Sequence, residues 1–80
     1  MSIKKSLKEL IPKDFTPNHA QNLINLLGSN PEKYQEVRFL ANDALDDRTW
    51  CENNEFNYSD QTREDLFRVM YGYALQKKYI

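Results

Sequence analysis

Two helix starts of the same kind occur in residues 16–45, TPNHAQNLINLLGSNPEKYQEVRFLANDAL. In each of them, a residue that can cap a helix, Thr16 or Asn30, comes directly before a proline. Proline suits the first helical position because its missing N–H would have no partner within the helix there. We therefore predict one helix that begins after Thr16 and another that runs from Asn30 to about Asp47. Gly28 is expected to end the first helix in the left-handed conformation.

Apolar residues recur along both segments with the spacing of a helix face. The predicted buried residues of the first segment are Ala20, Leu23, Ile24 and Leu27, with Leu26 on the flank. Those of the second segment are Tyr34, Val37, Leu40, Ala41, Ala44 and Leu45. Only a few residues separate the two helices, and short connections favour helices that pack directly on each other.

The same spacing predicts a helix on each side of this pair. The N-terminal one runs from Ser2 as N-cap to Ile11, where Pro12 stops it. The C-terminal one begins near Ser59 or Asp60 and buries Leu66, Phe67, Met70, Tyr71 and Ala74. Between them, Asn53, Asn54 and Asn57 favour turns, so residues 48–58 are expected to form a longer loop held by aromatic packing. The predicted fold is all-α: one domain over residues 1–80, a compact bundle of about four helices with an aromatic-rich loop.

Charge is balanced overall but uneven along the chain. The 80 residues carry 11 basic and 12 acidic side chains, a net charge of −1. This balance excludes a strongly cationic nucleic-acid binder and a highly acidic tail. Residues 43–65 hold eight carboxylates against two arginines, whereas residues 1–13 and 66–80 each have a net charge of +3. The acidic middle segment is therefore the most distinctive electrostatic feature of the sequence.

Residue types that commonly carry catalysis are few. The sequence has one histidine, His19, one cysteine, Cys51, and two glycines, so a disulfide, a multi-cysteine zinc site and a phosphate-cradling loop are not expected. We predict a surface or capping role for His19 and a buried, apolar role for Cys51 beside Trp50. A Cys51–His19 nucleophile pair is the weaker alternative, as is a metal site at Asp43, Asp46, Asp47 and Glu52. We predict no enzyme activity and no cofactor.

Location follows from the same absences. The longest apolar run is Phe39–Leu40–Ala41, which is too short to span a bilayer, and no apolar stretch follows the first residues as in a secretory signal. A single cysteine suits a reducing compartment. We therefore expect a cytoplasmic protein without membrane contact.

The functional hypothesis is a protein-binding module or modulator that engages a basic surface of a partner protein. Aromatic side chains in the acidic segment would act as anchors, and carboxylates would steer the encounter. The predicted partner-binding residues are Asp46, Asp47, Trp50, Glu52, Glu55, Phe56 and Tyr58. A basic surface that binds nucleic acid is one such target, which would make the chain an inhibitor; a small size of this kind is common among phage- and plasmid-encoded regulators.

The alternative is a small helix-turn-helix regulator that binds DNA as a dimer. In this interpretation Lys33, Gln35 and Arg38 would face the bases from the start of the second predicted helix of residues 16–45. Glu32 and Glu36 lie in the same turns and would be repelled by phosphates, so nucleic acid is the weaker of the two partner predictions. Self-association of the chain is compatible with both hypotheses.

Overall fold

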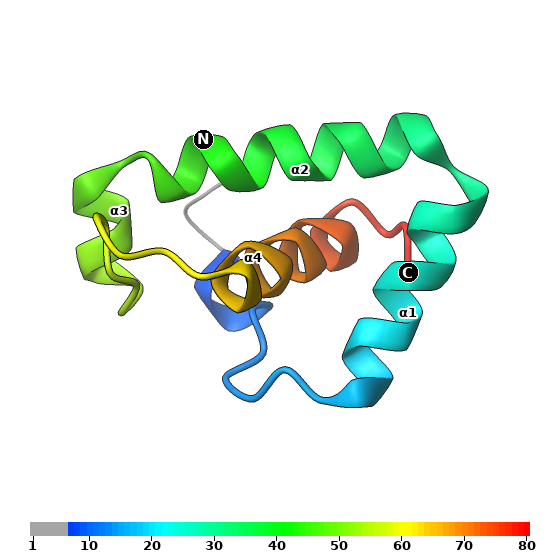
Figure 1. The fold of residues 1–80 in the computed structure, drawn as a ribbon, viewed down its shortest axis with the longest axis horizontal. Helices are drawn as coiled ribbons and strands as arrows, with labels where there is room; N and C mark the ends of the chain where they lie inside the picture. Colours follow the sequence, from blue (N-terminus) through cyan, green and yellow to red (C-terminus); the bar gives the residue numbers. More distant parts are fainter. Residues whose placement is uncertain (1–6) are drawn as a thin grey trace.

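The computed structural model describes residues 7–80, which form one short 3-10 helix, four α-helices and no strand (Figure 1). The elements are η1 Leu7–Glu9, α1 Pro17–Ser29, α2 Pro31–Leu45, α3 Arg48–Asn53 and α4 Arg63–Gln76. In Figure 1, α2 runs along the top with α4 beneath it, α1 descends on the right, and α3 turns down at the left end of α2. The predicted all-α fold is confirmed.

The N-terminal helix predicted over Ser2–Ile11 is not continuous in the described part. Residues 1–6, with the expected Ser2 cap, lie outside the described residues. From Leu7 the chain makes a single tight turn, in which the amides of Leu10 and Ile11 both donate to the Leu7 carbonyl, at 2.9 and 3.1 Å. This turn lets Leu7 and Ile11 pack together against Gly72 of α4, where both are buried. Tertiary packing therefore overrides the helical spacing here.

The start of α1 agrees with the sequence prediction. The amide of His19 donates to Thr16 Oγ1 at 3.3 Å, and the amide of Thr16 donates to His19 Nδ1 at 3.1 Å. This reciprocal pair is a capping box in which histidine takes the place usually held by a glutamate or glutamine. The predicted capping role of His19 is confirmed.

The junction between α1 and α2 differs in detail from the prediction. Asn30 is the N-cap of α2, but its side chain makes no capping hydrogen bond, so Pro31 carries the start signal. Gly28 lies inside α1 and has no positive φ, because the helix continues to Ser29 and the amide of Asn30 donates to the Leu26 carbonyl. The predicted left-handed glycine is therefore wrong.

The predicted loop 48–58 contains the six-residue helix α3. Asp47 caps it by accepting from the amide of Trp50 at 3.1 Å. The helix ends with Glu55 at φ 64° and the amide of Phe56 donating to the Cys51 carbonyl at 2.8 Å. This hydrogen bond is that of a Schellman ending, whose left-handed position usually holds glycine. Because this position holds a glutamate, the sequence lacks the glycine that usually marks the end of a helix.

Helix α4 begins at Arg63, which is later than the predicted start near Ser59 or Asp60. Its cap is Thr62, which forms a capping box with Asp65 through hydrogen bonds of 3.1 and 3.2 Å. It ends in a second Schellman arrangement, with Lys78 at φ 61° and the amide of Tyr79 donating to the Ala74 carbonyl.

The core lies around the middle of α4, where all six residues from Val69 to Ala74 are buried. The other buried apolar residues are Leu7, Ile11, Leu23, Leu26, Val37, Ala41, Ala44, Leu45, Trp50, Cys51 and Phe56. Six of the residues predicted to be buried are only partly covered: Ala20, Leu27, Tyr34, Leu40, Leu66 and Phe67. Ile24 is 56% exposed, which contradicts its predicted place in the core.

Candidate interaction surfaces

Two of the predicted anchors, Trp50 and Phe56, are inside the molecule. They are 8% and 6% exposed, and their rings stack at 5.7 Å between centroids with an angle of 9°. The guanidinium of Arg68 covers the Phe56 ring at 4.9 Å. Both rings fill the core and the end of α3, so their exposed area is small, and their role as anchors stays a prediction.

The other predicted residues lie on α3 and on the segments directly before and after it, at one end of the molecule (Figure 1). The exposed ones are Asp46, Glu52, Glu55 and Tyr58, whereas Asp47 is half-buried at the start of α3. Tyr58 is 45% exposed and is the one large ring of the predicted set that reaches solvent. Glu52 accepts from Arg48 Nε at 3.1 Å on the surface. Partner binding by these residues stays a prediction.

The outer side of α2 carries a residue that the sequence analysis did not single out. Phe39 is 72% exposed, the highest value among the exposed large apolar residues described. The residues on the same side of the helix, at spacings of four and seven from Phe39, are Glu32, Gln35, Asp43 and Asp46, and all are exposed. We call these five residues the acidic face of α2. The opposite side of the helix packs on α4, and Phe39 could have been found by its absence from that apolar stripe.

The C-terminal segment borders the acidic face. The Tyr79 hydroxyl donates to Glu36 Oε1, Lys77 Nζ lies 3.7 Å from Glu36 Oε2, and Lys33 Nζ lies 4.7 Å from the centre of the Tyr79 ring. The hydrogen bond to Glu36 raises the pKa of Tyr79, with desolvation adding to the effect. Because Glu36 binds its own chain in this way, the acidic face is defined without it.

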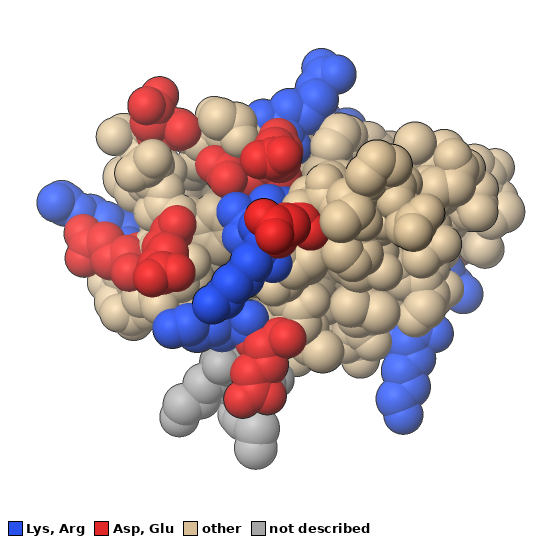
Figure 2. Space-filling view, turned by 90° about the horizontal axis from the view of Figure 1, so that it is seen from below, with Lys and Arg blue, Asp and Glu red and all other residues tan. Residues whose placement is uncertain are grey.

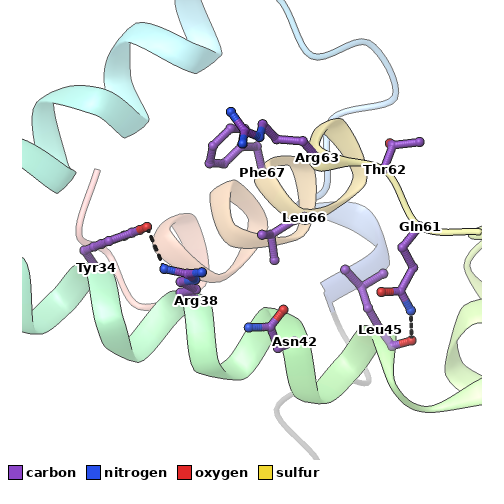
Figure 3. A pocket seen from close by; sticks show the side chains of 9 residues that line it. All are labelled: Tyr34, Arg38, Asn42, Leu45, Gln61, Thr62, Arg63, Leu66 and Phe67. Atoms are coloured by element: carbon purple, nitrogen blue, oxygen red, sulfur yellow. Dashed lines mark hydrogen bonds between the residues drawn. The ribbon is translucent and has the colours of Figure 1, made fainter.

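A groove of about 510 Å³ lies between α2 and the start of α4 (Figure 3). It is lined by Tyr34, Arg38, Asn42, Leu45, Gln61, Thr62, Arg63, Leu66 and Phe67. At one end the Gln61 side chain donates to the Leu45 carbonyl, and on α2 the Arg38 guanidinium donates to the Tyr34 hydroxyl at 3.3 Å (Figure 3). These nine residues include no thiol, imidazole or carboxylate, so the groove offers hydrogen bonds and apolar contact rather than an acid–base pair.

Cys51 is fully buried, as predicted, and its thiol donates to the Leu45 carbonyl at 3.2 Å. Burial raises the pKa of this thiol, and the nearby Asp47 and Asp46 carboxylates raise it further. Such a thiol stays protonated at neutral pH, which is the opposite of what a nucleophilic cysteine needs. The His19 side chain takes part in the capping box of α1, and its ring lies 4.9 Å from the Tyr71 ring between centroids.

Residues 7–80 contain no group of three or more His, Cys, Asp and Glu side chains placed to hold a metal ion. None of the helices described combines the length and apolar character that a membrane span requires. Comparisons with protein-family models, with curated proteins and with solved structures found no match.

Proposed function

We propose that the chain is a non-enzymatic protein-binding module that engages a basic surface of a partner protein. The observation that carries this proposal is the acidic face of α2, on which a highly exposed phenylalanine lies among three exposed carboxylates. A phenylalanine side chain buries about 150–250 Å² when it is covered, so Phe39 can supply most of the apolar contact of a small interface. The carboxylates supply attraction to a basic partner and restrict binding to surfaces of that charge.

Along the chain, the acidic face of α2 is followed by the other residues predicted from the sequence. Phe39 and Asp46 are seven positions apart in the chain, which corresponds to about 10 Å along the helix axis. Beyond Asp46, α3 presents Glu52, and the segment after it presents Glu55 and Tyr58. The proposed anchors are therefore Phe39 and Tyr58, in place of Trp50 and Phe56.

The chemistry of this surface specifies a partner with lysines or arginines around an apolar depression. Surfaces that bind nucleic acid are rich in such cations. A module with carboxylates at matching positions would compete with nucleic acid for them, so we propose that the chain acts as a regulator or inhibitor of such a protein.

Binding of duplex DNA through α2 is less well supported by the geometry. The candidate residues Lys33 and Arg38 contact the aromatic rings of Tyr79 and Tyr34, at 4.7 and 5.9 Å. The exposed side of the same helix carries the carboxylates of the acidic face, which phosphates would repel. For this reason we propose a protein partner and treat DNA binding as an outcome of the test.

The proposal is tested by comparing three forms of the chain as baits in lysate of the source cells: wild type, Phe39→Ser and Ile24→Ser. Both substitutions replace an exposed apolar residue with serine, but Ile24 lies on α1. A partner captured by wild type and by Ile24→Ser should be lost with Phe39→Ser. For the purified partner, we expect Phe39→Ser to weaken binding by about tenfold to a hundredfold, as for a hot-spot residue.

Salt and nucleic acid provide two further readouts for the purified pair. The affinity of the wild-type chain should fall as salt is raised, and added nucleic acid should displace it. Equal capture by Phe39→Ser and wild type, or binding that salt does not change, would overturn the proposal. A salt-dependent shift of a labelled DNA duplex by the chain alone would instead favour the helix-turn-helix alternative.

A further inference from the structure

Helix α1 has no charged side chain. The uncharged stretch extends over residues 15–31, FTPNHAQNLINLLGSNP, in a chain that otherwise carries 23 charged residues. Figure 2 shows the consequence: most charged side chains in the view gather on the left and centre, and a broad uncharged area occupies the right, where Figure 1 places α1, with basic side chains only at its lower and right edges. Small soluble chains usually cover exposed helix faces with charge, so this face has an unusual composition.

The centre of the uncharged face is apolar and incompletely packed. Ile24 is 56% exposed beside a cavity of about 100 Å³. The cavity is lined by apolar residues alone: Phe15, Ala20, Leu23, Ile24, Leu27 and Phe67. Ala20 and Gly28 lie one turn on either side of Ile24, and no atom lies within 4 Å of the place where a Cβ of Gly28 would stand. The Ile24 side chain therefore projects between two positions with small residues, Ala20 and Gly28.

One edge of this face is made of amides. Gln21 and Asn25 are exposed, and Gln21 Nε2 donates to Asn25 Oδ1 at 2.9 Å. An amide side chain carries both a donor and an acceptor, so it can hydrogen-bond to polar groups of a second copy without bringing a charge to the contact. A lysine or a glutamate in the same place could not.

We propose that the α1 face is the contact surface of a homodimer. In a two-fold dimer each patch meets its own copy, so a patch with charges of one sign would meet charges of the same sign across the axis. An uncharged face with amides at one edge avoids this repulsion, whereas the acidic face of α2 would place three carboxylates against three. An antiparallel pair of α1 helices with the axis near Ile24 sets the two isoleucines side by side and places Ala20 of one chain opposite Gly28 of the other.

The size of the face sets the expected strength. Thirteen helical residues span about 20 Å, and one face of a helix of this length offers less area than the roughly 800 Å² per partner of a standard interface. Phe15 and Phe67 extend it at one edge. We therefore expect a reversible dimer with a dissociation constant in the range of about 10–500 μM.

The test is analytical ultracentrifugation of the wild-type chain from about 10 μM to about 1 mM, a range that brackets the expected dissociation constant. The mean mass should rise with concentration from 9.5 kDa towards twice that value. Ile24→Ser should weaken the dimer by about tenfold or more, because it removes the apolar centre of the contact. Phe39→Ser is the matched control and should associate like wild type.

A second variant uses charge rather than apolar area. Gln21→Glu places like charges across the axis and should weaken the dimer at low salt, with recovery at high salt as the charges are screened. Circular dichroism checks that each variant keeps its helices. A wild-type chain that stays at 9.5 kDa over the whole range would overturn the proposal. So would Ile24→Ser or Gln21→Glu associating like wild type, or Phe39→Ser abolishing the dimer. Failure of the dimer proposal does not affect the proposed capture of a partner through Phe39, because the two contacts lie on different helices.

Discussion

At the scale of single residues, Tyr73 is the clearest test of the core. Its side chain is fully buried, and its hydroxyl has no hydrogen-bond partner in the described structure. Burial, followed by the Asp43 carboxylate, raises the pKa of Tyr73 from 10.0 to about 12. The unfolded chain therefore loses this proton at lower pH than the folded chain, so stability decreases as pH rises between these two values.

Replacement of Tyr73 by phenylalanine removes both the unpaired hydroxyl and its proton. We expect Tyr73→Phe to be more stable than wild type by about 1 kcal/mol at pH 7, because a buried hydroxyl without a partner is costly. The advantage should grow above pH 10, the ordinary pKa of the tyrosine hydroxyl. Urea denaturation at pH 7 and pH 11 measures both effects. A less stable Tyr73→Phe at both pH values would show that the hydroxyl is well paired.

We predict opposite effects on stability when each of the two glycines is replaced by alanine. A Cβ on Gly72 would lie 2.8 Å from Ile11 Cγ1, whereas a Cβ on Gly28 would meet no atom within 4 Å. Both residues are helical, so alanine gains up to about 1 kcal/mol of helix propensity at each position. We expect Gly28→Ala to be stabilising and Gly72→Ala to be destabilising by about 1 kcal/mol, because it pushes the N-terminal segment away from α4. Thermal melts of both variants at low protein concentration decide this, and equal stabilisation would contradict the close packing at Gly72.

At the scale of elements, two residues, Ser59 and Thr62, are candidates for the N-cap of α4. The structure places Thr62 at the cap, and Ser59 lies in the preceding turn. Thr62→Ala should cost about 0.5–2 kcal/mol because the Asp65 amide loses its partner, while Ser59→Ala should change little. Denaturant midpoints compare the two variants directly. A larger loss for Ser59→Ala would return the helix start to the position that the sequence predicted.

The elements that the sequence revealed share a local signal. Thr16–Pro17 and Pro31 mark the starts of α1 and α2 because capping and proline geometry depend on adjacent residues. Helix α3 was missed because its left-handed ending uses Glu55, where glycine is the usual sign. The start of α4 was misplaced because Ser59 is as good a cap as Thr62 by type, and the choice between them depends on non-local contacts.

At the scale of the whole molecule, Arg68 shows why some packing was not predictable. Its Nε donates to the Pro12 carbonyl at 2.9 Å, its guanidinium covers the Phe56 ring, and its Nη1 lies 3.7 Å from Asp65 Oδ1. One side chain thus holds the N-terminal segment and the end of the α3 region on α4. Contacts between residues 56 positions apart in the chain leave no pattern in the sequence.

The candidate site was predicted in part for the same reason. The acidic character of the segment around Asp46 and Glu52 is a property of composition, and these residues are exposed. The exposure of Phe39 depends on which side of α2 faces α4, and the burial of Trp50 and Phe56 depends on how α3 and the segment after it pack on the rest of the molecule. The uncharged face of α1 and the acidic face of α2 lie on different helices, so both proposed contacts can be studied in one molecule.

The most direct test of the central claim is an NMR titration of the isotope-labelled chain, kept dilute, with a synthetic peptide rich in arginine and leucine. A parallel titration uses a short DNA duplex. We predict that the peptide shifts the amide signals along the acidic face of α2, centred on Phe39 and reaching Glu52 and Tyr58. These shifts should leave Ile24 unchanged and should shrink in Phe39→Ser and in high salt. Peptide shifts centred elsewhere, or duplex shifts along α2 with none from the peptide, would contradict the account.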